Sequence, residues 1–318
     1  MRKKIISFYT FNKQVFTEYF ADNVLKYSAS LAYYTTLSLA PLLVILISLS
    51  GFLFGKEAMK GEVYNQIAGL VGTEAALQIQ AAIRNVHLHS NTAFATVVSI
   101  TVLLISTTGI FGEMQDSLNK IWGLKIKARK VWWKLITDRL LSFSLILSIG
   151  FVLTVSLILN ALVAAFSNKL NAVIMGAGDT LLPVIDTILS TAITTLMFAT
   201  IFKVLPDAKI KWKDVFIGAL ITSILFTLGK FGIGFYLGKS NLASVYGAAG
   251  SIIIIMLWIY YSSAIMYLGA VFTKVYASDY GGKIYPNDYS VWIKTEVTTV
   301  PDLTLNEKKI NTPGLSGR

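Results

Sequence analysis

The side chains with the most evident chemistry are three polar groups inside long apolar stretches of the sequence: Asp186, Lys230 and Asn160. Ionisable groups are costly inside a membrane and are usually paired or functional there. Asp186 and Lys230 stand about six and eight residues from the outer ends of their stretches, so at ~1.5 Å per residue both lie roughly 9–12 Å deep. We therefore predict an Asp186–Lys230 pair, with Asn160 nearby, lining a polar cavity open to the outer half of the membrane. The alternatives are a structural bridge between helices, or Lys230 extending outward along its own helix.

The first apolar stretch supplies a second group of candidates, because its opening turns are rich in hydroxyl groups. Tyr33 and Tyr34 stand among several serines and threonines, and Pro41 follows them. So many hydroxyls do not all face lipid comfortably, and a proline frees a backbone carbonyl. We expect Tyr33, Tyr34 and Pro41 to face neighbouring helices or a vestibule on the inner side, where they are candidates for a substrate pathway.

A third group combines cations with aromatic rings in one loop. Anionic membrane surfaces favour this combination, because aromatic rings settle at headgroup depth while Lys and Arg contact the headgroups. The loop predicts either ordinary anchoring at the interface or a specific lipid-headgroup site. Its members are Lys120, Trp122, Lys125, Lys127, Arg129, Lys130, Trp132 and Trp133.

Motifs of enzymes are missing from the sequence. There is no Walker A loop, no G-x-S-x-G elbow and no H-E-x-x-H pair. The two histidines, His87 and His89, have no nearby carboxylate, and the absence of cysteine excludes disulfides and thiolate metal sites. We therefore predict no enzyme, no metal and no cofactor.

Six long apolar stretches must position these groups, and each exceeds the ~20 residues that cross a bilayer as a helix. The predicted fold is all-α, a polytopic membrane protein with six transmembrane helices. Glycines such as Gly229, Gly232 and Gly234 suit close helix packing, and Gly234-x-x-x-Gly238 is a short packing motif. The predicted spans are Ser28–Gly55, Thr92–Glu113, Leu140–Phe166, Thr180–Val204, Asp214–Gly238 and Gly247–Tyr276.

Charge sets the orientation of these spans. Twenty-two of the 28 Lys and Arg residues fall in the N-terminal segment, the loops after the second and fourth spans, and the C-terminal segment. By the positive-inside rule both termini are cytoplasmic, as an even number of spans requires. The expected organisation is a cytoplasmic amphipathic segment over residues 1–27, a six-span domain over 28–276 and a cytoplasmic polar tail over 277–318. The net charge of +11 is sorted by side of the membrane, which indicates anionic lipid and not nucleic acid.

The segment before the first span has helical periodicity. Apolar residues recur at helical spacing from Ile5 to Phe20, while Thr10, Lys13 and Thr17 fall on the opposite side. The pattern predicts an amphipathic helix on the cytoplasmic membrane surface. A cytoplasmic helix packed on the bundle is the alternative.

Several short strings follow one another along the chain: Ser28-Ala29-Ser30-Leu31-Ala32-Tyr33-Tyr34-Thr35 through Pro41, Leu118-Asn119-Lys120-Ile121-Trp122, Arg139-Leu140, Lys203-Val204-Leu205-Pro206 with Trp212, Tyr246-Gly247-Ala248-Ala249-Gly250, Leu257-Trp258-Ile259-Tyr260 and Leu268-Gly269-Ala270. As a set they resemble landmarks of the YihY/virulence factor BrkB family, in the right order from about residue 10 to 277. The resemblance implies a bacterial inner-membrane protein with six spans and cytoplasmic termini. Members have carried a ribonuclease BN label, which this sequence does not support. Val271 stands where the family is expected to have an acidic residue.

The family is linked to serum resistance and more loosely to transport of envelope lipids or solutes. Together with the buried polar pair and the basic aromatic loop, this leads us to expect transport of a lipid or other amphiphile. An ion-coupled carrier of small solutes and a non-transporting scaffold for envelope assembly are the alternatives. The expected partners are membrane lipids, anionic on the cytoplasmic face, with homo-oligomerisation or an envelope protein partner left open.

Overall fold

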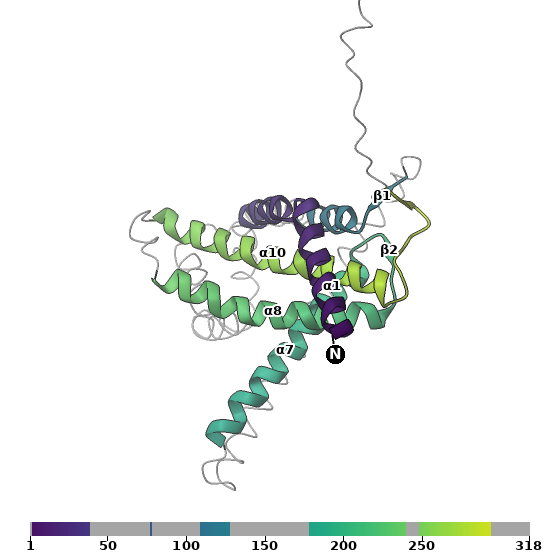
Figure 1. Ribbon diagram of the computed structural model, residues 1–318. Helices are drawn as coiled ribbons and strands as arrows, with labels where there is room; N and C mark the ends of the chain where they lie inside the picture. The colour runs from purple at the N-terminus through teal and green to yellow at the C-terminus, as the bar shows by residue number, and fades with distance from the viewer. Residues whose placement is uncertain (1, 39–76, 78–108, 128–177, 240–247, 294–318) are drawn as a thin grey trace, which may run out of the picture.

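The computed structural model describes residues 2–38, 77, 109–127, 178–239 and 248–293, and these residues are mostly helical (Figure 1). Two helical segments, 24–38 and 109–121, accompany the named elements. The elements are α1 (Arg2–Ala21), β1 (Leu124–Ile126), α7 (Gly178–Val204), β2 (Ala208–Lys209), α8 (Trp212–Lys239), α10 (Ala248–Asp279), β3 (Tyr285–Pro286) and β4 (Ser290–Trp292).

Three of the described helices are long and apolar enough to cross a membrane. They cover Thr187–Val204, Trp212–Leu237 and Ile252–Asp279, with mean hydropathies of 1.6, 1.8 and 1.9. They coincide with the last three predicted spans. Of the other three, the first two fall only partly within the described residues, and Leu140–Phe166 lies outside them. The second helix also ends later than predicted, at residue 121 and not at Glu113.

Helices α8 and α10 are held together by two glycine–threonine contacts, and each helix supplies the glycine of one contact and the threonine of the other. A Cβ atom added to Gly218 would lie 1.9 Å from Thr273 Oγ1, and one added to Gly269 would lie 1.8 Å from Thr222 Oγ1. Each glycine therefore receives the threonine of the other helix, which lets the two backbones approach closely. Both hydroxyls donate to a carbonyl of their own helix, Thr222 to Gly218 O and Thr273 to Gly269 O, each at 2.7 Å.

The glycines singled out from the sequence divide into two kinds. Gly229 is tightly packed, because a Cβ there would come within 2.4 Å of Ile265 Cδ1 and 2.9 Å of Tyr261 Cε1. At Gly234 no atom of the described residues would lie within 4 Å of an added Cβ, so they show no close packing there. The tight contacts of α8 within the described part of the chain lie at Gly218 and Gly229.

Two small antiparallel sheets close one end of the bundle. In one sheet β1 pairs with β4, and in the other β2 pairs with β3. The segments that meet there, 122–127, 205–211 and 280–293, are far apart in the sequence but adjoin at the same end (Figure 1). We call these three segments the cap. The first part of the predicted polar tail is thus folded into β3 and β4, and α10 continues to Asp279.

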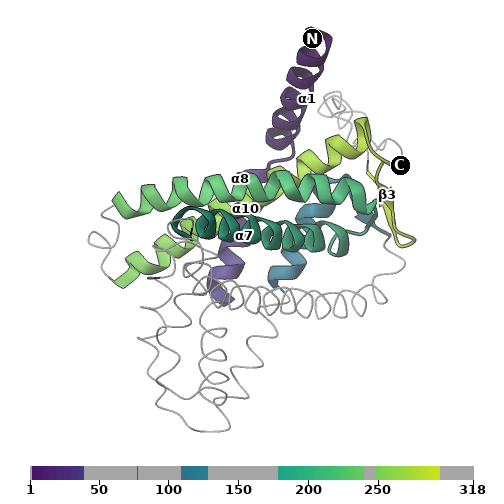
Figure 2. The ribbon, with the colours of Figure 1, turned by 90° about the horizontal axis from the view of Figure 1, so that it is seen from below.

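Helix α1 runs crosswise to α8 and α10 in both views (Figures 1 and 2). It packs on the C-terminal part of α10, where the ring of Phe11 lies 5.2 Å from that of Phe272. Lys274 of α10 forms ion pairs with Glu18 at 2.9 Å and with Asp22 at 3.4 Å. One face of α1 is therefore packed on the bundle, as the alternative from the sequence proposed.

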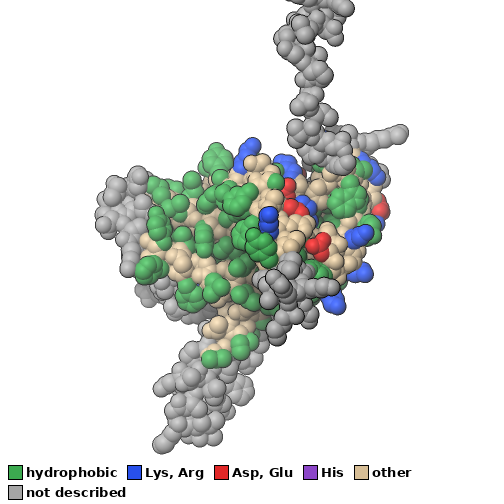
Figure 3. All heavy atoms as spheres, viewed as in Figure 1, with side chains coloured by type: hydrophobic (Ala, Val, Ile, Leu, Met, Phe, Trp, Pro, Cys, Tyr) green, Lys and Arg blue, Asp and Glu red, His purple; other side chains and the backbone are tan. Residues whose placement is uncertain are grey.

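The surface divides along the bundle axis. In Figure 3 hydrophobic side chains spread over the part of the bundle away from the cap, while Lys, Arg, Asp and Glu gather toward the capped end. Along α8 the exposed side chains recur at helical spacing, and they include Leu220, Ile224, Leu228, Phe231 and Phe235. An apolar stripe of this kind is expected of a helix whose outer face meets lipid.

Candidate functional site at the capped end of the bundle

The cap is organised around one buried carboxylate. Asp207 is only 1% exposed, and its two carboxylate oxygens accept hydrogen bonds from Gln115 Nε2 at 3.1 Å and Asn119 Nδ2 at 2.8 Å. Its backbone N–H donates to Asn119 Oδ1 at 2.8 Å, and its carbonyl accepts from Ser290 Oγ at 2.8 Å. Buried polar groups of this kind are costly unless they are fully paired. Asp207 therefore fixes helix 109–121, the α7–α8 connection and the C-terminal segment in one arrangement.

Trp122 forms a second buried hydrogen bond that connects the cap to the bundle. Its side chain is fully buried, and its indole N–H donates to the carbonyl of Ala270 in α10 at 3.1 Å. The prediction that Trp122 contacts lipid headgroups is therefore wrong. The reason is that the helix extends through residue 121, which carries the ring inward against α10 instead of leaving it in a surface loop. Two of the strings that carry the family resemblance, 118–122 and 268–270, thus meet at this hydrogen bond.

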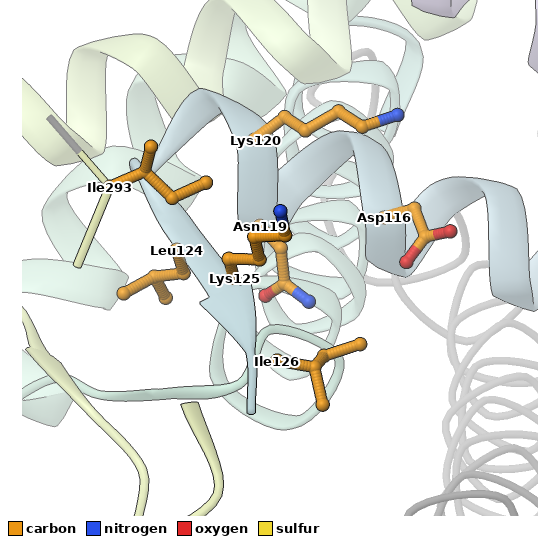
Figure 4. A pocket seen from close by; sticks show the side chains of 7 residues that line it. All are labelled: Asp116, Asn119, Lys120, Leu124, Lys125, Ile126 and Ile293. Carbon is orange, nitrogen blue, oxygen red and sulfur yellow. The ribbon is translucent and has the colours of Figure 1, made fainter. Parts of the chain in front are cut away.

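Beside these buried hydrogen bonds lies a pocket of about 310 Å³ that is lined by both charged and apolar side chains. They come from helix 109–121, β1 and the residue after β4 (Figure 4). Lys120 and Lys125, both predicted headgroup contacts, line it together and are exposed. The lining residues are Asp116, Asn119, Lys120, Leu124, Lys125, Ile126 and Ile293.

A contact of Lys120 locates this pocket relative to the first predicted span. Its ammonium group lies 5.5 Å from the centre of the Tyr27 ring, within the range of a cation–π contact. Tyr27 immediately precedes the first predicted span, so the pocket lies at the level where that span would enter the membrane. The ammonium group of Lys127, in contrast, donates to the carbonyl of Asp288 at 3.0 Å. Of the remaining loop candidates, Arg129, Lys130, Trp132 and Trp133 lie outside the described residues.

The predicted polar pair is placed on two neighbouring helices. Asp186 belongs to α7 and Lys230 to α8, and these helices are joined where Ser223 Oγ donates to the carbonyl of Thr191 at 2.9 Å. Asp186 precedes Thr191 and Lys230 follows Ser223, so both backbone positions lie on the side of that contact away from the cap, although α7 runs obliquely away from α8 there (Figure 1). The side chain of Asp186 and all of Asn160 lie outside what the structure describes, so the pair stays a prediction.

The hydroxyl groups at the start of the first predicted span have partners within their own helix. Ser28 donates to Val24 O, Thr35 to Leu31 O, Thr36 to Ala32 O and Ser38 to Tyr34 O, at 2.7–2.9 Å. Such bonds to the preceding turn let hydroxyl groups sit in an apolar setting. These hydroxyls therefore do not require a polar vestibule.

The two tyrosines of this segment are on its surface. Tyr33 and Tyr34 are 57% and 39% exposed, and Tyr34 borders Gly109 of helix 109–121, where an added Cβ would lie 3.1 Å from Tyr34 Cδ1. Pro41 lies outside the described residues. Their role in a pathway stays a prediction.

Two further positions bear on chemistry. Val271 is fully buried in the apolar core of the bundle, so a polar role expected at this position from the family has no counterpart here. Within the described part of the chain, no three His, Cys, Asp or Glu side chains lie close enough together to hold a metal ion.

Long apolar helices, a lipid-facing stripe and a charged cap at one end together define a helical membrane protein. Comparison with known sequences is more specific: the chain matches the virulence factor BrkB family over residues 15–289, and it belongs to that family.

Relatives of the chain carry the name UPF0761 membrane protein. One from Psychromonas ingrahamii is 30% identical over 263 residues, covering 79% of this chain and 82% of the relative. One from Tolumonas auensis is 26% identical over 247 residues, covering 76% and 77%. One from Chromobacterium violaceum is 28% identical over 259 residues, covering 79% of this chain but 58% of the longer relative. No solved structure matches the chain.

Proposed function

We propose that this chain is a six-span protein of a bacterial inner membrane that moves or presents a lipid or another amphiphile. The observation that carries the proposal is the pocket at the capped end. Lys120 and Lys125 offer two cations to a phosphate-bearing headgroup, while Leu124, Ile126 and Ile293 offer an apolar wall to the adjoining glycerol and acyl groups. An amphiphile is the class of molecule that needs both surfaces at once. No catalytic step is part of this proposal.

The cap supports the topology that goes with this function, because segments on opposite sides of a bilayer cannot pair with each other. Between 211 and 280 the chain crosses twice, through α8 and α10. Between 127 and 205 α7 supplies one crossing, so a shared side requires another, for which the apolar stretch Leu140–Phe166 is the candidate. With an even count both termini share one side of the membrane, and the excess of Lys and Arg there supports the cytoplasmic side.

A single cysteine tests this topology, since the chain has none of its own. In Lys213→Cys, at an exposed position next to the cap, a membrane-impermeant maleimide should label the protein only after the cells are opened. Labelling of intact cells would place the cap outside and refute the topology.

The lipid proposal is tested by native mass spectrometry of protein released from nanodiscs made of phosphatidylethanolamine and phosphatidylglycerol. The wild type should retain lipid, and Lys120→Gln with Lys125→Gln should lose most of it. Lys213→Gln, which removes an exposed positive charge that does not line the pocket, is the matched control. Equal retention by all three proteins would contradict the proposal, provided that each elutes as a single folded species.

An ion-coupled carrier of small solutes is the second candidate, because Asp186 and Lys230 stand on the parts of two neighbouring helices, α7 and α8, that lie away from the cap. If Asp186 titrates during transport, uptake should depend on pH and Asp186→Asn should flatten that dependence. Unchanged pH dependence in the variant would argue against coupling at this residue.

A further inference from the structure

Helix α1 has three distinct faces and not two. At about 100° per residue, the buried Phe11, Val15 and Tyr19 form one face that packs on α10. A second face, turned from the first by about 120°, carries three exposed aromatic rings. These are Tyr9, Phe16 and Phe20, exposed by 69%, 53% and 64%.

The third face is polar and exposed. Thr10 and Thr17 lie on it, turned by about 90° from the aromatic rings and by about 150° from the packed face. Lys13 is exposed at the border between the aromatic and polar faces. A helix that only packs on a bundle needs one apolar face, so the second apolar face calls for another apolar neighbour.

The direction of α1 indicates which neighbour this is. Helices α8 and α10 are candidate membrane spans, and α1 runs crosswise to them at their capped end (Figures 1 and 2). A helix crosswise to the spans lies parallel to the membrane plane. After a turn at Asp22 and Asn23, where Asn23 has a φ of 54°, the chain continues directly into helix 24–38, which opens the first predicted span. The C-terminal end of α1 is therefore close to the membrane surface.

The charge of α1 points to the same surface. The helix carries Arg2, Lys3, Lys4 and Lys13 against a single acidic residue, Glu18, which is engaged by Lys274. Cations on a surface helix are attracted to anionic headgroups, and a lysine at the edge of an apolar face can extend its ammonium group to them. A partner protein would have to match both the aromatic rings and this positive charge, whereas an anionic bilayer surface offers both properties.

We propose that α1 lies in the lipid surface, with Tyr9, Phe16 and Phe20 inserted at the boundary between headgroups and acyl chains. The face with Phe11, Val15 and Tyr19 stays packed on α10 and the polar face lies toward water, so α1 fixes the capped end of the bundle at the membrane surface. Such helices are typically held by apolar burial together with attraction to anionic lipids. This proposal needs only a membrane protein and does not depend on the pocket or on lipid transport.

The absence of cysteine allows a nitroxide to be placed at one position at a time. The variants are Phe16→Cys and Phe20→Cys on the aromatic face, and Thr10→Cys and Thr17→Cys as matched controls on the polar face. All four positions are exposed, so the label displaces no buried side chain. Tyr9→Cys is a further site on the aromatic face should one of the first two variants fold poorly.

Each labelled protein is placed in nanodiscs of phosphatidylethanolamine and phosphatidylglycerol, and the relaxation of the label is measured with oxygen and with a water-soluble nickel chelate. Labels at 16 and 20 should respond more to oxygen, which partitions into lipid, and labels at 10 and 17 more to nickel. Equal nickel access at 16 and 17 would overturn the proposal, because the aromatic face would then be open to water. Protection of position 16 from both reagents would also overturn it, because protein would then cover the face.

Discussion

The glycine–threonine contacts between α8 and α10 allow a single methyl group to be used as a test of the bundle. Replacing Gly218 by alanine would place Cβ 1.9 Å from Thr273 Oγ1 and 2.8 Å from Thr273 Cβ. Ordinary contact begins at 3.4 Å, so the two helices would have to separate by about 1.5 Å at this point. Rotating Thr273 gives little relief, because its hydroxyl is held by the carbonyl of Gly269 and its Cβ atom is itself too close.

The expected cost follows from this displacement. Forcing an extra carbon into a well-packed contact typically costs about 1–3 kcal/mol, and a gap of about 0.5–1 Å already forfeits a quarter to a half of the dispersion energy of the atoms beside it. Gly269→Ala should cost a similar amount, since its Cβ would lie 1.8 Å from Thr222 Oγ1. In Gly234→Ala no atom of the described part of the chain lies within 4 Å of the new methyl group, and the better helix propensity of alanine predicts a change from zero to a gain of about 1 kcal/mol.

The assay is reversible unfolding of the purified protein in mixed micelles with increasing sodium dodecyl sulfate, followed by tryptophan fluorescence. Gly218→Ala and Gly269→Ala should unfold at clearly lower detergent fractions than the wild type, and Gly234→Ala should not. Combining Gly218→Ala with Thr273→Gly removes all three threonine atoms near the new methyl group, so the losses should be less than additive. If Gly218→Ala proves as harmless as Gly234→Ala, the register of α8 against α10 is wrong.

Two further predictions concern the cap and α1. Asn119→Ala should destabilise the protein by about 1–3 kcal/mol, because it removes a hydrogen bond to the buried carboxylate of Asp207 and the acceptor of the Asp207 backbone N–H. Gln14→Ala, which removes a local bond to Glu18, should cost about 0.2–0.5 kcal/mol. Equal losses in the same unfolding assay would contradict the structural role of Asp207. Burial raises the pKa of Asp22 above its ordinary value of 3.8, against the opposing effect of Lys274 and with a further rise from Glu18. Just above pH 3.8 the folded state therefore binds more protons than the unfolded state. The free energy of unfolding should then fall as pH rises through the raised pKa and stay lower above it. Asp22→Asn should remove that fall in thermal stability, and a rise in the wild type that depends on Asp22 would contradict the sign.

The helices in the second half of the chain could be predicted closely from the sequence. The predicted span ending at Val204 ends there in α7, and the predicted Asp214–Gly238 corresponds to Trp212–Lys239 in α8. Length and hydropathy set such boundaries, because a bilayer accepts only backbone that satisfies its own hydrogen bonds over a fixed thickness. These properties are local in the sequence, which is why no tertiary information was needed.

The partners of Asp207 could not be predicted in this way, since Gln115 and Asn119 stand 92 and 88 residues from it in the sequence. The burial of Trp122, in contrast, could have been predicted from the spacing of apolar residues before it. Met114, Leu118, Ile121 and Trp122 recur at helical spacing and are all buried, so the apolar face of the helix continues into what looked like a basic loop.

The contact between α8 and α10 also corresponds to a short sequence pattern, which differs from the one that we considered. A search for small residues four apart finds Gly234 and Gly238, but the contacts that matter pair a glycine with a threonine. Gly218-x-x-x-Thr222 and Gly269-x-x-x-Thr273 have the same spacing on two antiparallel helices, which is what reciprocal contacts require. The pattern becomes informative only when both helices are considered together.

The residues that line the pocket are held in place by the buried contacts of the cap, and this affects how a lipid headgroup would be recognised. Asn119 lines the pocket and also binds Asp207, Trp122 secures the end of the same helix to α10, and β4 holds β1 on the other side. The backbone positions of Lys120 and Lys125 are therefore set by buried contacts, although both side chains are exposed. Two cations on a fixed frame can discriminate between headgroups by geometry as well as by charge, because little order must be imposed when the ligand binds. A loop that carried the same lysines without such buried contacts would attract any anionic surface, whereas under the proposed function these fixed positions would favour a single bound molecule.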